Sequence, residues 1–272
     1  MNKKWLATGA LTITMALGAT SGWAQTTCPP PTLTGTELDT DGDGFADVLE
    51  ICGIQLYSTK PLIVSDPATR DVFVSMVIAP GGVIEQIFGA GNFAPFNAAT
   101  YVGNGVNVSF NGQVALGVNV HLVSDADTDP LGTRRVDSRA SQLAVRIAED
   151  TSTTGTILGN CQWGTPDGFD GCVVYTQRIK NFIDTNCPGN TDADRALMFK
   201  AYVTESFLHE TGHSMGGLAP TYNSRTGGYH YKSGSGFVME QSVTYTAKNG
   251  TCTWNISPAW NLSSDPQSVR LK

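Results

Sequence analysis

One long helix, predicted at residues 195–215, constrains the fold of this 272-residue chain more than any other segment. The stretch contains no proline, and Gly216-Gly217 follows it as a helix-ending signal. Asp192 or Asp194 can cap its first turn, because a short acidic side chain accepts hydrogen bonds from free backbone N–H groups. Its apolar face is supplied by Leu197, Ala201, Phe207 and Leu208. A chain of this length suits one large domain or two small ones and can bury a substantial core.

Shorter segments with a β-type pattern precede this helix. β-Rich composition, or alternation of apolar and polar residues, predicts strands at residues 71–78, 106–110, 116–123 and 172–179. Two further helices are expected at residues 83–88 and 138–149. Strands interleaved with a few helices indicate an α/β or α+β fold.

The first 24 residues have the pattern of an export signal. Lys3 and Lys4 give a positive start, residues 5–19 are mostly apolar and uncharged, and small residues precede the expected cleavage after Ala24. We therefore expect residues 1–24 to be a signal peptide. No later segment is long and apolar enough to span a bilayer. The mature chain is expected to be secreted, to the extracellular space or the periplasm.

Charge and composition exclude several classes of protein. Only 15% of the residues are charged, which argues against a disordered chain and against a coiled coil. The formal charge is −7, and it becomes −9 without the signal, which holds two lysines and no acidic residue. Nucleic-acid binders need a basic face, so a nucleic-acid partner is not expected. We expect a monomer.

All six cysteines lie outside the signal, and an even number in an oxidising compartment predicts three disulfides. Fifteen connectivities are compatible with six cysteines. Cys28–Cys52 and Cys161–Cys172 are the attractive local pairs, which would leave Cys187–Cys252.

A metal-binding pattern lies near the end of the long helix, in His209-Glu210-Thr211-Gly212-His213. A spacing of four residues places both imidazoles on one helical face, where they can bind the same zinc ion. Glu210 beside them can accept a proton from water. A catalytic zinc needs a third protein ligand, and we assign His230, in a glycine-flanked loop. An acidic third ligand is the alternative, but after the motif no glutamate precedes Glu240 and no aspartate precedes Asp265. His121 lies in an expected strand and is interpreted as structural.

The pattern resembles the metzincin zinc metalloproteases, whose signature is H-E-x-x-H-x-x-G-x-x-H followed by a methionine-containing turn. The match extends through Gly216, but Ala219 stands where the third histidine would fall. It resumes with His230 and with Met239, in Gly236-Phe237-Val238-Met239. Longer spacers of this kind occur in leishmanolysin-like metzincins. The resemblance implies a twisted mixed sheet, an active-site helix, a small C-terminal subdomain and a packing role for Met239 under the zinc.

This resemblance implies a secreted zinc endopeptidase that hydrolyses peptide bonds with metal-activated water, with Glu210 as general base. Its partner would be a protein or peptide substrate. The alternative is a calcium-dependent surface or adhesion module with a non-catalytic metal site. An intact Glu210 favours the enzyme, because a purely structural zinc site does not need it.

A second metal-binding pattern lies near the N-terminus, where residues 39–50 satisfy D-x-D-x-D-G-x5-E. Carboxylates and a backbone carbonyl suit calcium, a hard cation. The loop resembles the single calcium loops of thrombospondin type 3 or dockerin modules, with only an exiting helix near residues 48–56, and we expect a structural role. The expected organisation is a calcium-loop segment at residues 25–65 and a metzincin-like catalytic domain at residues 66–272. The expected calcium ligands are Asp39, Asp41, Asp43, Phe45 through its carbonyl, Asp47 and Glu50.

Residues 125–130 form another acidic run, but this run lacks the glycine and the terminal glutamate of a calcium loop. We therefore interpret it as an acidic turn.

Overall fold

The computed structural model describes residues 33–103, 105–110, 116–131, 133–162, 171–215, 222–223, 228–231, 235, 237–240, 244–256 and 259–261. The expected signal peptide and Cys28 lie outside these residues. The expected α/β architecture is confirmed, because a five-stranded mixed sheet packs against helices. The division of the chain at residues 24 and 65 stays a prediction.

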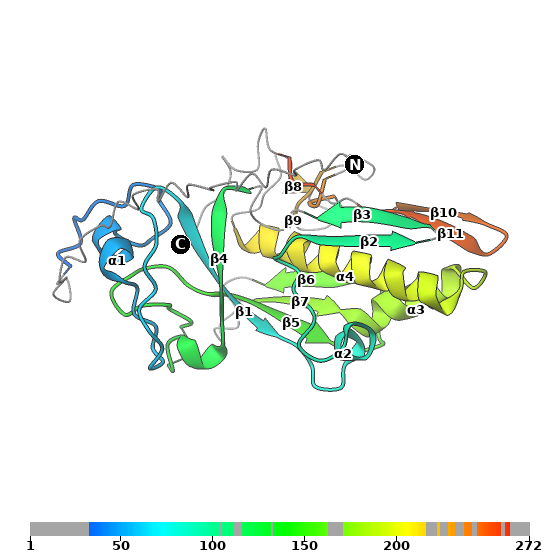
Figure 1. Ribbon diagram of the computed structural model, residues 1–272, viewed down its shortest axis with the longest axis horizontal. Coiled ribbons are helices and arrows are strands. Elements are labelled where there is room, and N and C mark those ends of the chain that lie inside the picture. The colour runs from blue at the N-terminus through cyan, green and yellow to red at the C-terminus, as the bar shows by residue number, and fades with distance from the viewer. Residues whose placement is uncertain are drawn as a thin grey trace, which may run out of the picture.

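The central sheet has the strand order β4-β1-β5-β7-β6. Its strands are β1 (Arg70–Val77), β4 (Val118–Val123), β5 (Val145–Asp150), β6 (Gly159–Gln162) and β7 (Gly171–Tyr175). The first four strands in that order pair in parallel, whereas β6 is antiparallel to β7 and ends the sheet. This antiparallel strand contacts helix α4 (Asp192–Ser214), which carries the metal-binding pattern (Figure 1).

Helix α4 lies between two layers, which explains why it is buried on most of its surface (Figure 1). One layer is the central sheet, which α4 contacts through β5, β6 and β7. The other is the hairpin of β2 (Ala99–Gly103) and β3 (Val106–Phe110). Helices α2 (Val83–Phe88) and α3 (Thr176–Asn186) pack beside α4.

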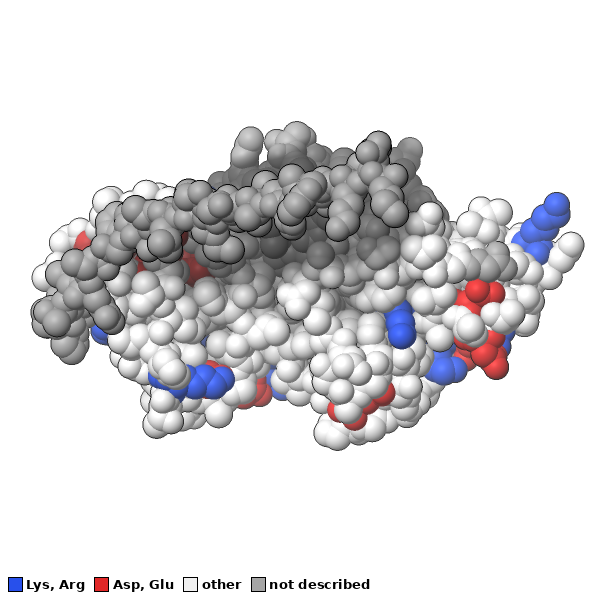
Figure 2. All heavy atoms as spheres, viewed as in Figure 1, with Lys and Arg blue, Asp and Glu red and all other residues white. Residues whose placement is uncertain are grey.

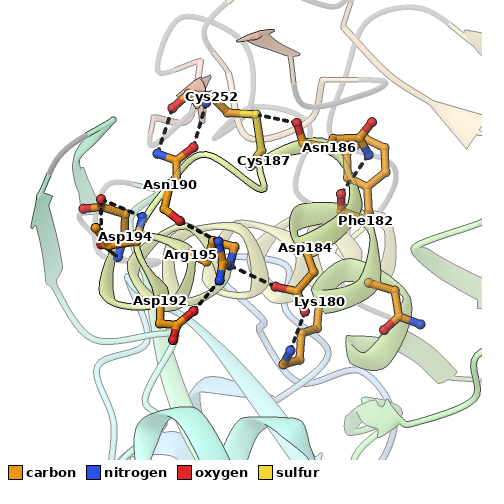
Figure 3. A network of polar contacts seen from close by, with 12 residues as sticks. Lys180, Phe182, Asp184, Asn186, Cys187, Asn190, Asp192, Asp194, Arg195 and Cys252 are labelled. Atoms are coloured by element: carbon orange, nitrogen blue, oxygen red, sulfur yellow. Dashed lines mark hydrogen bonds and ion pairs between the residues drawn. A yellow bond between two sulfur atoms is a disulfide. The ribbon is translucent and has the colours of Figure 1, made fainter. Parts of the chain in front are cut away.

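The start of α4 is tied to the C-terminal part of the chain (Figure 3). The disulfide Cys187–Cys252 joins the end of α3 to β11 (Thr251–Asn255), which pairs with β10 (Thr244–Lys248). Asn190 exchanges hydrogen bonds with the backbone of Cys252, over 2.7 and 3.3 Å. Thr191 caps the helix through a reciprocal contact with Asp194. The start of the helix is thereby fixed against the C-terminal hairpin.

Two short hairpin strands and two short helical segments complete the described elements. Strands β8 (Tyr222–Asn223) and β9 (Gly228–Tyr229) pair antiparallel between α4 and the C-terminal hairpin in sequence. Helix α1 (Asp47–Cys52) lies at the N-terminal end, where the calcium-type loop leads into it. Residues 125–127 form a 3-10 turn closed by a capping box, as expected for an acidic turn.

Strand β1 supplies side chains to two separate apolar cores. Val72 and Val74 belong to the main core with α4, whereas Phe73 points to the opposite face. There the Phe73 ring contacts that of Phe45, with ring centroids 5.4 Å apart, and Leu49 of α1 joins the same core. The N-terminal loop is therefore packed directly on the central sheet.

The connection between β4 and β5 is held to this second core by a buried ion pair. Asp137 accepts hydrogen bonds from the Arg139 side chain at 2.6 and 2.9 Å and from the backbone N–H of Gln55 at 2.7 Å. Burial alone would raise the pKa of the Asp137 carboxyl, but these hydrogen bonds outweigh it and hold the pKa below its usual range. The carboxylate form of Asp137 thus stabilises the fold.

Several predicted elements are confirmed, and two are wrong. The helix at 83–88 and the strand at 106–110 have their predicted bounds. The helix predicted at 138–149 is wrong, because residues 145–150 form β5 between β1 and β7. The strand predicted at 172–179 ends at Tyr175, where α3 begins. Both of the predicted disulfides within the described residues are present, and Cys52 is also disulfide-bonded.

The described helices include none that combines the length and apolar character needed to cross a membrane. Figure 2 shows that charged side chains on one face are scattered among uncharged atoms.

Candidate metal centre

Helix α4 and the loop after β9 bring three imidazoles to one point. His209 and His213 lie one turn apart on α4, and His230 directly follows β9. The Nε2 atom of His213 lies 3.1 Å from that of His209 and 3.2 Å from that of His230. The structure therefore assembles the three histidines that the sequence singled out.

The turn at residues 237–240 fixes two members of this triad. The Nδ1 atom of His209 lies 2.8 Å from the carbonyl oxygen of Val238, to which it donates its proton. The Nε2 atom is then left with a free lone pair, as a metal ligand requires. The backbone N–H of Tyr231, next to His230, donates to the carbonyl of Met239 at 2.7 Å. One turn thus orients a ring from the helix and anchors the loop that carries the third ring.

Burial keeps the imidazoles of His209 and His213 neutral at physiological pH. Desolvation lowers the pKa of His209 to about 4, and desolvation together with the two neighbouring imidazoles lowers that of His213 further. His209 donates its proton to Val238, so at most one of the two close approaches of the His213 Nε2 atom can be a hydrogen bond, and the other is not explained by hydrogen bonding. Tetrahedral zinc with Zn–N bonds near 2.05 Å would separate two ligand nitrogens by about 3.3 Å, close to the distances observed. The residues therefore fit a three-histidine zinc site.

Glu210 lies against the edge strand of the sheet. It is 6% exposed, and its burial raises the pKa of the carboxyl to about 8. Its Oε2 atom lies 3.1 Å from the sulfur of Cys161 in β6. A methyl group on Gly159, in the same strand, would lie 2.1 Å from the other carboxylate oxygen. The glycine thus provides the space that Glu210 occupies.

Met239 packs beneath the metal-binding helix. Its side chain is fully buried, and its sulfur would lie 2.4 Å from a Cβ atom at Gly212. Trp260 lies on the same glycine, with ring atoms 3.2 Å from that position. The glycine between Glu210 and His213 is what lets the turn approach α4 this closely.

The acidic residues of the N-terminal loop also gather, with one addition from the sheet. Ligand-type oxygens of Asp39, Asp41 and Asp43 lie within 4.8 Å of one another, as do those of Asp43, Glu50 and Asp71. Asp71 lies in β1 and was missed by the loop pattern. The sequence feature that could have identified Asp71 is its position as a charged residue at the start of a mostly apolar segment.

The Asp47 carboxylate lies outside both groups of close carboxylates, and its role as a calcium ligand stays a prediction. It accepts hydrogen bonds from the backbone N–H and hydroxyl of Thr40, both at 2.7 Å, and so closes the loop internally. The Phe45 backbone N–H donates to Asp43, and its ring is fully buried.

Two other groups of potential ligands are accounted for. Cys161 and Cys172 approach Glu210, but they form a disulfide and offer no thiolate to a metal. His121 lies in β4, where its Nε2 atom donates to Asp71 at 2.7 Å and its ring stacks on Phe73. It is therefore separate from the triad, in line with its interpretation as a structural residue.

Comparisons with protein-family models, with curated proteins and with solved structures found no match for this chain. The histidine triad and the acidic cluster are therefore the features of this chain that indicate its function.

Proposed function

We propose that this protein is an exported zinc-dependent endopeptidase. The observation that carries the proposal is the convergence of three imidazole Nε2 atoms, from His209, His213 and His230, with the buried Glu210 next to His209 in helix α4. Three protein ligands leave one position of a tetrahedral zinc for chemistry, whereas structural zinc sites use four. Zinc held there would polarise the substrate carbonyl, acidify the attacking water and favour the carboxylate form of Glu210.

The residues of the chain have distinct roles in this proposal. Glu210 accepts the proton of the attacking water and returns it to the leaving amine. Val238 holds the His209 ring in the tautomer that exposes Nε2. Met239 supports the helix at Gly212 in the position of a methionine-containing turn. No covalent intermediate with the protein is required.

The edge of the sheet offers a place for an extended peptide. Among the described strands, β6 is the last of the sheet, and its residues Gly159 and Cys161 contact Glu210. A peptide that adds to such an edge as a further strand gains main-chain hydrogen bonds and passes beside the proposed base. Binding of this kind recognises the backbone, which suits an endopeptidase acting on unfolded or loop segments.

Export is supported by the disulfides. Cys161–Cys172 and Cys187–Cys252 tie together parts of the chain around α4, and disulfides persist in oxidising compartments. The signal-type sequence at residues 1–24 is consistent with this proposal.

Cleavage of casein by the purified mature protein tests the proposed activity. The assay contains excess calcium throughout, and 1,10-phenanthroline is added to remove zinc, because nitrogen ligands prefer zinc to calcium. We expect the chelator to abolish cleavage and added zinc to restore it. Glu210→Gln should retain the zinc and lose at least about 100-fold in rate, the usual range for general acid–base catalysis.

Glu85→Gln is the matched control, since Glu85 lies in α2 and the same chemical change is made away from the triad. It should cleave casein at the wild-type rate. Cleavage that is absent, or that is unaffected by both the chelator and Glu210→Gln, would contradict the proposal and favour a calcium-dependent binding module.

A further inference from the structure

We infer that Asp71 of the central sheet joins Asp41, Asp43 and Glu50 of the N-terminal loop in binding one calcium ion. The ion would therefore connect the loop to β1, rather than only closing the loop on itself. This inference is independent of the proposed peptidase activity, because it concerns other residues and its tests measure calcium binding and stability.

Three carboxylates in the cluster share an unusual arrangement. In Asp41, Glu50 and Asp71, one oxygen accepts a hydrogen bond from the protein, and the other is buried without a hydrogen-bond partner among the described residues. Glu50 and Asp71 are fully buried side chains. Buried carboxylate oxygens are normally paired, because an unpaired charge in the interior is costly. Three of them, in two groups of close carboxylates that share Asp43, indicate a cation as the missing partner.

The spacing of the oxygens suits calcium. Asp43 belongs to both groups of mutually close carboxylates, so that the loop group and the group with Asp71 meet at this residue. Within each group the ligand atoms lie within 4.8 Å of one another. Two oxygens on opposite sides of a calcium ion, each about 2.4 Å from it, would be about 4.8 Å apart. The donor set contains only oxygens, which favours a hard cation over zinc.

The surrounding residues hold the two halves of the site together. The backbone N–H of Asp71 donates to Asp43 at 2.7 Å. The amide of Gln142 donates to the backbone carbonyls of both Asp43 and Asp71, at 2.8 and 2.7 Å. His121 fixes one oxygen of Asp71, and Arg70 donates to the backbone carbonyl of Asp41 at 2.8 Å. These contacts hold the N-terminal loop against β1 in the position that binding of one shared ion requires.

Asp71→Asn tests the assignment in the full mature protein, with Asp66→Asn as the matched control. Asparagine keeps the shape of the side chain and can still accept from His121, but it removes the charge. Asp66 precedes β1 and lies outside both groups of close carboxylates. We expect Asp71→Asn to raise the calcium Kd at least about tenfold, because affinity follows the number of charged ligands. Asp66→Asn should bind calcium like the wild type.

Thermal unfolding separates a ligand from a merely structural residue. Without calcium, Asp71→Asn should have a Tm equal to or above that of the wild type, because a buried like charge has been removed. With calcium, its Tm should rise much less than that of the wild type. A Tm that is lower by the same amount with and without calcium would overturn the inference, as would an unchanged Kd. An equal or larger rise with magnesium in place of calcium would overturn the choice of ion.

Hydrogen exchange on the wild-type protein gives a test that needs no variant. Calcium should slow exchange both in residues 39–50 and in residues 70–73, because one ion holds both segments. Slowing confined to residues 39–50, or absent from both segments, would overturn the role of Asp71.

Discussion

The contact between Gly212 and Met239 predicts that the effect of Gly212→Ala on stability changes sign when Met239 is replaced. In an ordinary helix interior, replacing glycine by alanine stabilises by about 1 kcal/mol. In α4, the new methyl group would lie 2.4 Å from the sulfur of Met239, far inside the normal separation of about 3.5–4.0 Å. Overpacking of this kind costs about 1–3 kcal/mol. Gly212→Ala should therefore destabilise the wild-type protein by about 0–2 kcal/mol, after the helical gain is subtracted.

The effect of Gly212→Ala on stability should reverse in a protein that carries Met239→Ala. Met239→Ala empties a fully buried site and should cost about 2–5 kcal/mol. In that background the methyl group at position 212 no longer overlaps Met239, and the Trp260 ring, 3.2 Å from it, can shift into the emptied site, so the helical preference of alanine dominates. We expect Gly212→Ala to stabilise the Met239→Ala protein by up to about 1 kcal/mol. The coupling between the two positions would then be about 1–3 kcal/mol, within the usual range for residues in contact.

The measurement is a double-mutant cycle by urea denaturation, followed by circular dichroism, with zinc and calcium present and the disulfides intact. Met198→Ala supplies the control background, because Met198 is equally buried but lies about 21 Å away along the same helix. There Gly212→Ala should keep its wild-type effect. Equal effects of Gly212→Ala in all three backgrounds would refute the packing argument.

Three further predictions follow from contacts already described. His230→Ala should lose zinc on dialysis in calcium-containing buffer, whereas His121→Ala should retain it; equal zinc contents by metal analysis would contradict the assignment of the triad. The pKa of Asp137 is lowered in the folded protein. Its contribution to the free energy of unfolding is therefore complete above the unfolded-state pKa of about 3.9 and is lost as the pH falls through the folded-state pKa. The difference in Tm between wild type and Asp137→Asn should therefore narrow between pH 6 and pH 3, and a constant difference would argue against this linkage. Gly159→Ala should displace the Glu210 carboxylate and lower casein cleavage about 100-fold while zinc content is unchanged; wild-type activity would show that Glu210 does not need this space.

The sequence was most informative where one residue type and one spacing carry the chemistry. The four-residue spacing of His209 and His213 requires a helix to bring the rings together, and α4 does so. His230 could be assigned because the chain has only four histidines and the loop is flanked by glycines. The contact that orients His209, from the backbone of Val238, could not be predicted, because any residue supplies a carbonyl there.

The errors arise where tertiary context overrides local preference. Residues 138–149 contain alanine, leucine, glutamine and arginine, which favour a helix, yet β5 forms there because it can pair with β1 and β7 on both sides. The loop motif likewise could not reveal Asp71, which approaches the other carboxylates only through the packing of the loop against β1. Long-range contacts of this kind leave no periodic signal in the sequence.

The disulfide between Cys161 and Cys172 has a consequence for the cell that makes the protein. It joins directly paired residues of β6 and β7, and its sulfur atoms form the wall against which Glu210 lies. Because disulfides do not persist in a reducing cytoplasm, the proposed peptidase should remain inactive there until it is exported as proposed. The proteins of the producing cell would then not be cleaved while the chain is being made. Protein produced and kept reduced should cleave casein only after oxidation, and full activity before oxidation would disprove such self-protection.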